Sequence, residues 1–294
     1  MPPLTVQETD LRDTLRRDVE KLAGEIGERN VPRYRALAAA ADFLESSLRE
    51  SSSEARRLGY QVAGVTCHNI EAEIRGSELA DEIVIIGAHY DSVQGSPGAN
   101  DNATGAAAVL ALAGLFAGKK TSRTLRFVEF VNEEPPYFKS PAMGSLVYAN
   151  DCKIRGEKIV AMLSLETIGY YTDERGSQHY PFPFSLFYPS IGNFIGFVGN
   201  TSSADLVRKV VTSFRRHAKY PSEGGALPST IPGIGDSDQW SFWQRGYQAV
   251  MVTDTAPFRY PYYHTRGDTP DKVRYDHLAK VVWGLQGVIA DLVR

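Results

Sequence analysis

The chain has 294 residues, of which 43% are hydrophobic and 23% are charged, which is the composition of an ordinary globular protein. Its net charge of −3 argues against a nucleic-acid partner and against an anionic membrane surface. The sequence contains no run of about 18 apolar residues, so we expect no membrane span. The opening residues have neither the basic start nor the apolar core of a signal peptide. We therefore expect a cytoplasmic protein, or a secreted one if a leader has been removed.

The N-terminal part of the chain predicts helices followed by strands. Apolar residues recur at helical spacing within residues 10–50, on both sides of Pro32, and predict two helices packed on a sheet. Residues 60–65 and 70–74 are expected to be strands, the second with the alternation of an edge pair. The continuous apolar run 82–88 is typical of a strand buried on both faces.

The rest of the chain alternates strands with helices. The predicted strands are 125–131, 160–165, 249–253 and one near 194–198, and the predicted helices are 103–117, one ending near 145–150, 203–217 and 275–293. Residues 170–202 are expected to be mostly irregular and 220–238 to be loop. This alternation predicts an α/β fold, a parallel or mixed sheet covered by helices, in a single domain that spans residues 1–294.

Candidate metal ligands stand directly after three of the predicted buried strands. His89 and Asp91 follow the first of these strands, Glu133 and Glu134 follow the second, and Glu166 follows the third. In open α/β sheets, ligands bind outside the carboxyl ends of the strands. We therefore expect these side chains to converge on one edge of the sheet.

Two further candidates lie in loops. Asp101 sits in a glycine-bounded turn, and His264 lies in a tyrosine-rich loop beyond the strand 249–253. Taken alone, Asp101 would be an ordinary helix N-cap and His264 a stacked surface aromatic. Taken together with the strand-end residues, they complete two histidines, a central aspartate and two further carboxylates. That set is enough for two metals that share the aspartate, with one glutamate left as a base.

The residues next to these candidates suggest which side chains would bind metal and which would transfer protons. Asp91 can accept the proton of the second ring nitrogen of His89, as carboxylates beside metal-binding histidines do. The adjacent acids Glu133 and Glu134 would repel each other in a crevice unless a cation is present. Glu134 would then bind metal, while Glu133 takes a proton from a metal-activated water and gives it to the leaving amine. Tyr263 could donate a hydrogen bond to the developing oxyanion.

The order of these motifs, His-x-Asp, Asp-Asn, Glu-Glu, an acidic residue and His, resembles a known family. This is the family of zinc-dependent exopeptidases that includes bacterial leucyl aminopeptidases, glutamate carboxypeptidases and glutaminyl cyclases, metallopeptidase family twenty-eight. The resemblance runs from about residue 83 to residue 275. It implies a three-layer sandwich, in which helices cover both faces of a mixed, mostly parallel sheet. It also implies Zn²⁺ as the cofactor, as two ions per chain or as one.

The resemblance also implies roles for the candidate residues. His89 and Glu166 would hold one metal, Glu134 and His264 would hold the other, and Asp101 would bridge them. Glu133 would be the general base, Asp91 would orient His89, and Tyr263 would assist the oxyanion. The peptide bond between Asp101 and Asn102 would be cis.

Two residues depart from the pattern of the family. Glu166 stands where the well-studied aminopeptidases usually have Asp, and the extra methylene leaves a one-metal site open. Gln239 replaces a histidine often found after Ser-Asp, and we expect it to affect local packing rather than metal binding.

These features predict an aminopeptidase that hydrolyses the first peptide bond of a peptide with a free N-terminus. The segments 170–190 and 221–235 are expected to shape its specificity pocket. A glutaminyl cyclase-like acyltransferase with one zinc, a carboxypeptidase and a non-catalytic binding module on the same fold remain alternatives. The sequence leaves open the preferred N-terminal residue, the native metal and the oligomeric state.

Overall fold

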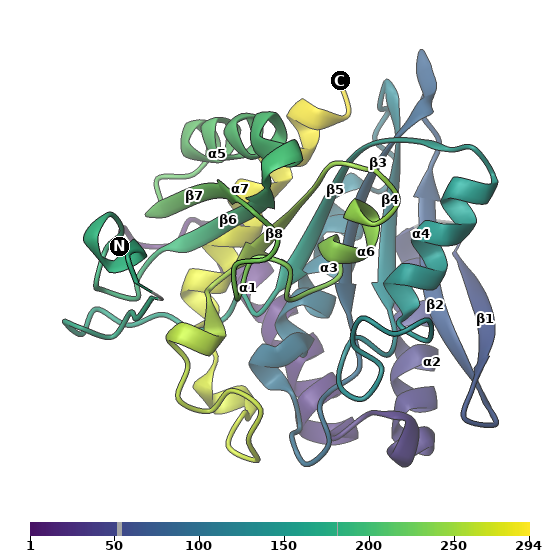
Figure 1. The fold of residues 1–294 in the computed structure, drawn as a ribbon, viewed down its shortest axis with the longest axis horizontal. Coiled ribbons are helices and arrows are strands. Elements are labelled where there is room, and N and C mark those ends of the chain that lie inside the picture. Colours follow the sequence, from purple (N-terminus) through teal and green to yellow (C-terminus); the bar gives the residue numbers. More distant parts are fainter. Residues whose placement is uncertain (52–54, 181) are drawn as a thin grey trace.

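The computed structural model describes residues 1–51, 55–180 and 182–294. At its centre is an eight-stranded sheet in the order β1-β2-β4-β3-β5-β8-β6-β7. Strands pair in parallel at β4–β3, β3–β5, β5–β8 and β6–β7, and the other three pairs are antiparallel. Figure 1 shows this sheet between two layers of helices, which confirms the mixed α/β sandwich expected from the sequence.

The elements have the following bounds in chain order. The strands are β1 (Arg56–Val62), β2 (Val65–Ile74), β3 (Leu79–His89), β4 (Arg123–Phe130), β5 (Lys158–Glu166), β6 (Ile195–Asn200), β7 (Ser222–Leu227) and β8 (Ala249–Thr253). The α-helices are α1 (Val6–Val19), α2 (Tyr34–Ser51), α3 (Thr104–Phe116), α4 (Gly144–Ile154), α5 (Ala204–His217), α6 (Gln239–Trp243) and α7 (Tyr275–Leu292).

Alternation along β3 shows why the sheet is covered on both faces. Val84 and Ile86 belong to the core shared with α1, α2, α3, α5 and α7, whereas Ile83 and Ile85 belong to the core under α4 and α6. Successive side chains of a strand point to opposite faces, so a strand that is apolar at every position needs cover on both. This is why the apolar run 82–88 forms a strand inside the sheet, between β4 and β5.

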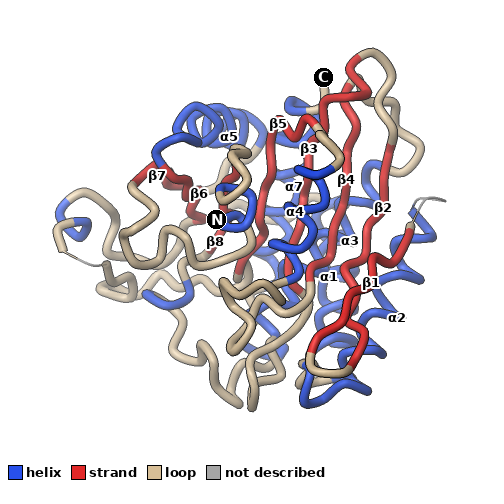
Figure 2. The backbone as a smooth tube through the Cα atoms, turned by 45° about the vertical axis from the view of Figure 1, so that its right-hand side comes forward, coloured by secondary structure: helices blue, strands red, loops and turns tan. Residues whose placement is uncertain are grey.

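The helical cover is uneven between the two faces. Helix α6 has only five residues and packs against β5 and β8. The same face of β6 and β7 is covered by loop segments instead of a helix, as Figure 2 shows. The carboxyl ends of β3, β4 and β5 lie at the edge of the sheet where many of the tan loops of Figure 2 gather.

The structure differs from the predicted elements at the first strands. The predicted strand 60–65 is broken by a two-residue turn at Ala63 and Gly64, both with positive φ, of 48° and 84°. β1 and β2 form a hairpin around that turn, and β2 begins at Val65 rather than at Ile70. The apolar residues continue across the turn, so their spacing alone does not reveal it.

β7 lies inside the segment 220–238 that the sequence predicts as loop. Its sequence Ser-Glu-Gly-Gly-Ala-Leu lacks the β-branched and aromatic residues that identify strands. β7 forms because the parallel ladder to β6 satisfies its backbone, with Gly196 opposite Glu223 and Asn200 opposite Leu227. Within the described residues, none of the helices combines the length and the apolar character needed to cross a membrane.

Candidate metal centre

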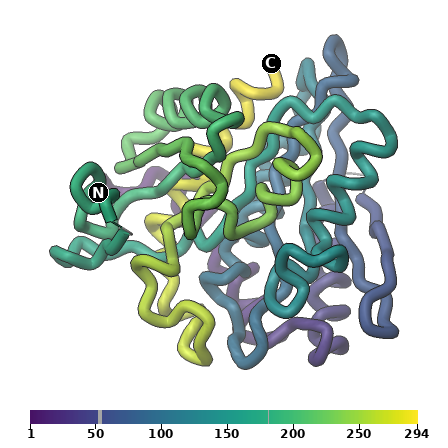
Figure 3. The backbone as a smooth tube through the Cα atoms, in the orientation of Figure 1, coloured from purple at the N-terminus to yellow at the C-terminus, as the bar shows by residue number. Residues whose placement is uncertain are grey.

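The fold brings the strand-end residues to one edge of the sheet. His89 is the last residue of β3, Glu166 is the last residue of β5, and Glu133 and Glu134 follow β4 by three and four positions. These three strands are parallel neighbours, so their carboxyl ends meet. His264 reaches the same edge from the loop after β8, and Figure 3 shows that loop (yellow-green) near the loop that precedes α3 (blue).

Two groups of donor atoms share Asp101. His89, Asp101 and Glu166 form one group, Asp101, Glu134 and His264 form the other, and the donor atoms within each group lie within 4.8 Å of one another. His89 Nε2 is 3.3 Å from Asp101 Oδ1 and 3.2 Å from Glu166 Oε2. His264 Nε2 is 3.1 Å from Asp101 Oδ2 and 3.3 Å from Glu134 Oε2. The two oxygens of Asp101 thus face different groups, as a bridging carboxylate would.

The loop that carries Asp101 is held by its backbone. Asp268 accepts hydrogen bonds from the backbone N–H groups of Asn100, at 2.8 Å, and Asp101, at 3.1 Å. Asn102 Oδ1 accepts from the backbone N–H of Gly105 in the first turn of α3, whereas the Asp101 carboxylate makes no capping bond to that helix. The Asp101–Asn102 peptide bond is cis, as the family resemblance implied. The carboxylate of Asp101 is therefore left for the two histidines.

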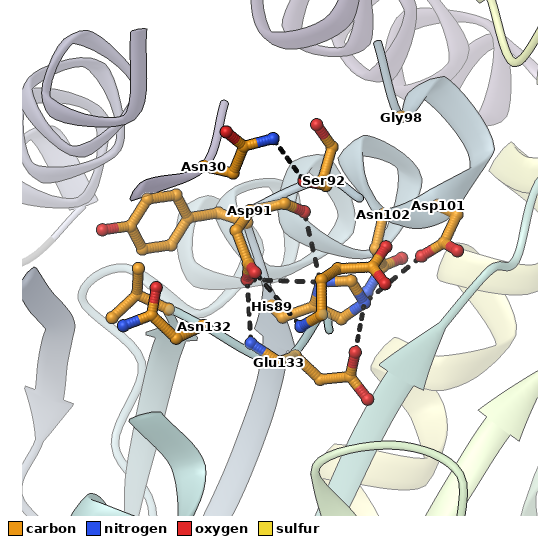
Figure 4. Close-up of polar contacts among 12 residues, drawn as sticks. Asn30, His89, Asp91, Ser92, Gly98, Asp101, Asn102, Asn132 and Glu133 are labelled. Atoms are coloured by element: carbon orange, nitrogen blue, oxygen red, sulfur yellow. Dashed lines mark hydrogen bonds and ion pairs between the residues drawn. The ribbon is translucent and has the colours of Figure 1, made fainter. Parts of the chain in front are cut away.

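Asp91 contacts His89 through its main chain as well as through its carboxylate. The nearest acceptor to His89 Nδ1 is the main-chain carbonyl of Asp91, at 3.2 Å, whereas the Asp91 carboxylate is 3.6 Å away. That carboxylate accepts hydrogen bonds from the backbone N–H groups of Glu133, at 3.1 Å, and Glu134, at 3.2 Å (Figure 4). The Asp91 carboxylate thus ties the end of β3 to the acidic pair after β4. The main-chain carbonyl of Asp91 points at the imidazole ring of His89.

Glu166 reaches the first donor group despite its extra methylene. Its Oε2 lies 3.2 Å from His89 Nε2 and accepts a hydrogen bond of 2.6 Å from Ser237 Oγ. Gln239 is buried and donates to the carbonyl of Ile234 at 3.0 Å, so it does hold the local packing of the loop after β7. How many metal ions the centre holds remains a prediction.

Backbone strain is concentrated beside the donors. Among the described residues, six that are not glycine have positive φ, and three of them belong to this centre: Asn132 (62°), Thr167 (45°) and His264 (56°). Asn132 directly precedes Glu133, and Thr167 directly follows Glu166. Such conformations cost of order 1–3 kcal/mol each and persist where the surroundings over-determine them, often at functional sites.

The electrostatics of the centre call for cations. Burial, reinforced by the neighbouring carboxylates, raises the pKa of Glu133, Glu134 and Glu166 above the ordinary value. Burial lowers the pKa of His89, but the charges of Glu166 and Glu133 outweigh it and raise that pKa well above 6.5. His89 Nε2 is buried and has no hydrogen-bond partner. Nitrogen and oxygen donors in this arrangement fit zinc or a similar divalent ion, which would stabilise the ionised carboxylates.

Arg29 was not singled out in the sequence, yet it supports the loop that carries the site. Its guanidinium is fully buried and donates to five backbone carbonyls, of Leu22, Gly27, Tyr90, Pro97 and Gly98. Burial lowers the pKa of Arg29 to about 10, and the charge of Asp91 acts against this. The residue therefore joins the N-terminal helices to both ends of the segment 90–98.

Asp268 and Ser237 were also assigned no role from the sequence. Ser237 lies directly before Asp238 and Gln239, and Asp268 lies four positions after His264, so nearness to residues already considered was the available signal. Their contacts with Asp101 and Glu166 join residues 167 and 71 positions apart, which no local pattern reveals.

A mostly apolar cavity opens beside Glu166 and Tyr263. It encloses about 930 Å³ of empty space, including the part open to solvent. Its floor is the face of β8, β6 and β7 that α4 and α6 leave uncovered, and its walls come from residues 178–188 and 231–236. The segments 170–190 and 221–235, which were expected to shape a specificity pocket, thus contribute to its lining, although residue 181 lies outside the described residues.

Tyr263 stands where the cavity meets the metal centre. Its ring stacks on the imidazole of His264, with centroids 3.9 Å apart and planes at 19°. Burial, followed by the charge of Asp101, raises the pKa of the Tyr263 hydroxyl well above its ordinary value, so the group stays protonated. It can therefore donate a hydrogen bond to a substrate in the cavity.

A mixed sheet that presents histidines and carboxylates at the carboxyl ends of its strands, beside an apolar cavity, has the features of a metal-dependent hydrolase. Residues 69–288 match peptidase family M28, and the chain belongs to this family. The family suggested by the sequence is thereby confirmed.

Individual relatives agree with this assignment. Uncharacterized protein YfbL of Escherichia coli K12 is 33% identical over 282 residues, which cover 93% of this chain and 86% of that protein. Leucine aminopeptidase 1 of Arthroderma otae is 26% identical over 262 residues, and the match spans 83% of this chain but only 64% of that longer protein. A zinc aminopeptidase from Bacillus subtilis shares the fold, with a TM-score of 0.72, 15% identity and coverage of 100% of this chain and 97% of that one.

We predict that the stability of the metal-free protein falls as the pH rises. Burial raises the pKa of Glu134 from 4.5 to about 7. Burial lowers the pKa of His264, but its contacts with Asp101 and Glu134 raise it from 6.5 to about 10. Each group binds more protons in the folded than in the unfolded state. The folded protein therefore loses stability as the pH rises from 4.5 to about 7 for Glu134, and from 6.5 to about 10 for His264.

Calorimetry between about pH 6 and about pH 9 checks this, since both intervals overlap that range. The Tm of the metal-free protein should fall with increasing pH, and the gain in Tm on adding Zn²⁺ should grow, because metal ligands must be deprotonated. A Tm of the metal-free protein that rises over this range would contradict the prediction.

Replacing Arg29 by Met should destabilise the protein by about 3 kcal/mol or more, because each buried acceptor left without a donor costs about 1–3 kcal/mol. The five carbonyls that Arg29 serves would lose this donor, and those of Leu22 and Gly98 would keep only the backbone N–H groups of Gly27 and Ala103. Denaturant unfolding measures the change, with Arg208→Met as the matched control, because Arg208 is exposed on α5. Equal unfolding midpoints for the Arg29 variant and the control would show that these contacts add nothing.

Proposed function

We propose that this protein is a zinc-dependent aminopeptidase that removes the first residue of peptides with a free N-terminus. The observation that carries the proposal is the pair of donor groups that share Asp101 beside the mostly apolar cavity. One substrate side chain can lie in it while the peptide bond lies over the donors.

The charges around the cavity favour the amino end of a peptide over the carboxyl end. Among the described residues, the lining includes no Lys, Arg or His that could pair with a substrate carboxylate, and the acid where it meets the donor groups is Glu166. A substrate carboxylate needs a cationic partner to be bound, whereas a free ammonium group pairs with carboxylates. Arg259 lies behind the wall, where it is 7% exposed and donates to Gln178 at 2.7 Å.

The chain's own residues define where metal would be held. His89, Asp101 and Glu166 would hold one ion, and Asp101, Glu134 and His264 a second. Bound zinc supplies a Lewis acid for the substrate carbonyl and lowers the pKa of a water nucleophile.

Glu133 is suited to move a proton. It belongs to neither donor group, yet its Oε2 lies 3.9 Å from His89 Nε2. Burial, reinforced by Glu166 and Glu134, raises its pKa, so its carboxylate can accept a proton from the attacking water and pass it to the nitrogen of the leaving amine. The Tyr263 hydroxyl donates a hydrogen bond to the carbonyl oxygen as that oxygen becomes negative.

The proposal is tested by mass spectrometry of an unblocked peptide pool and its N-acetylated counterpart, incubated with zinc-loaded protein. We expect the first residue to be lost from the unblocked pool alone, because only a free ammonium group can pair with the carboxylates at the centre. Loss from the carboxyl end would indicate a carboxypeptidase, and loss of ammonia without cleavage a glutaminyl cyclase. Either result would overturn the proposal.

Replacing Glu133 by Gln should lower kcat by about 10²–10⁴-fold, the usual contribution of a positioned acid–base group. The amide keeps the shape but cannot accept the proton, and the bound zinc should stay at the wild-type level because Glu133 belongs to neither donor group. Steady-state kinetics and metal analysis measure both quantities. Glu134→Gln is the matched control, and it should lose zinc. Full activity of the Glu133 variant would rule out its role as the base.

A further inference from the structure

The cavity has a second acidic residue at the end remote from the metal centre. Glu166 on β5 is opposite Thr253 on β8, Thr253 is opposite Gly196 on β6, and Gly196 is opposite Glu223 on β7. Residues opposite one another in a sheet point to the same face, and strands lie about 4.8 Å apart. The Glu166 and Glu223 backbones are therefore separated by three strand spacings, roughly 14 Å, across the cavity floor.

The surface between these two acids suits a long apolar chain. Along it lie Thr253, Met251 and Val198, and Gly196 presents no side chain at all. Phe184 and Phe258 line the walls. A side chain that starts at the metal centre and runs toward β7 would bury its carbon atoms here and carry its far end to Glu223.

Two tyrosines stand near the far end. Tyr180 and Tyr188 line the cavity with their ring centroids 5.8 Å apart. Burial and, after it, the charge of Glu223 raise the pKa of Tyr188, which shows that the two groups are close. Tyrosine faces attract cations. The far end of the cavity therefore offers both a carboxylate and aromatic rings to a positive charge.

The protein itself neutralises Glu223 only weakly. The nearest guanidinium, of Arg215, stays 3.9 Å from its carboxylate and donates instead to the hydroxyl and the carbonyl of Ser222. By contrast, Asp236 at the cavity wall is paired with Lys139 at 3.1 Å and with the backbone N–H of Gly233 at 2.9 Å. Of these two acids, Glu223 is the one placed to receive a cation from the substrate.

We propose that Glu223 is a specificity-determining residue that selects substrates with an N-terminal lysine or arginine. This inference rests on the proposed aminopeptidase function and names its substrate class. Lysine and arginine have an apolar stem and a charged head, so the stem lies along the floor while the head pairs with Glu223. An aliphatic residue such as norleucine fills the floor equally well but leaves Glu223 without a partner.

The test compares kcat/KM for lysine, arginine and norleucine anilides on zinc-loaded wild-type protein and on Glu223→Gln. The wild type should prefer lysine over norleucine, and the variant should lower this ratio about tenfold or more, the effect of losing one charged hydrogen bond. Norleucine hydrolysis should be unchanged, which a general structural defect would not allow. Asp205→Asn is the matched control, since Asp205 is exposed on α5 and is paired with Arg208.

The possible outcomes test the role of Glu223 separately from the proposed aminopeptidase function. Hydrolysis of all three anilides without a preference for the basic ones, or an equal loss for all three in the Glu223 variant, overturns the inference and leaves the aminopeptidase standing. If none of the anilides is hydrolysed by zinc-loaded wild-type protein, the proposed function fails and takes the inference with it.

Discussion

The structure depends on the desolvation of carboxylates at one edge of the sheet. Asp101, Glu133, Glu134 and Glu166 are all at most 7% exposed, within reach of two histidines. Removing that many negative charges from water is unfavourable unless protons or cations accompany them. The raised pKa of the three glutamates expresses this cost in the absence of metal. An edge built in this way gains stability when it binds divalent cations.

The surrounding loops are held mainly through the backbone, which leaves the metal-facing donors available. Asp91 and Asp268 accept backbone N–H groups, and Arg29 donates to backbone carbonyls. Side chains that serve the backbone in this way fix the loop positions without occupying the oxygens of Asp101. Positive φ values at Thr167 and His264 show the conformations that such support maintains. The side chains that hold the loops in place thus differ from the side chains that face the metal site, although the two sets lie near one another.

The cavity beside the metal centre arises from uneven cover of the sheet. Helices α4 and α6 leave the face of β6 and β7 to loops, and loops with glycine and aromatic residues enclose a cavity rather than filling it. This places a mostly apolar floor directly beside the donor groups. The edge strand β7 closes the floor, so the one charged side chain on β7, Glu223, lies at its far end. The proposed selectivity for basic residues rests on the same asymmetry that exposes the floor.

The sequence by itself determined the fold class, the family and the set of residues that meet at the centre. His89 and Glu166 were predictable because each follows an apolar strand, and parallel strands end at one edge. The tertiary structure alone decided the strand β7, the five contacts of Arg29 and the link from Asp268 to Asp101. Those features depend on partners far away in the chain, and local periodicity carries no information about such partners. A strand end can be recognised from its own residues, whereas a buried hydrogen bond requires both of its ends to be in place.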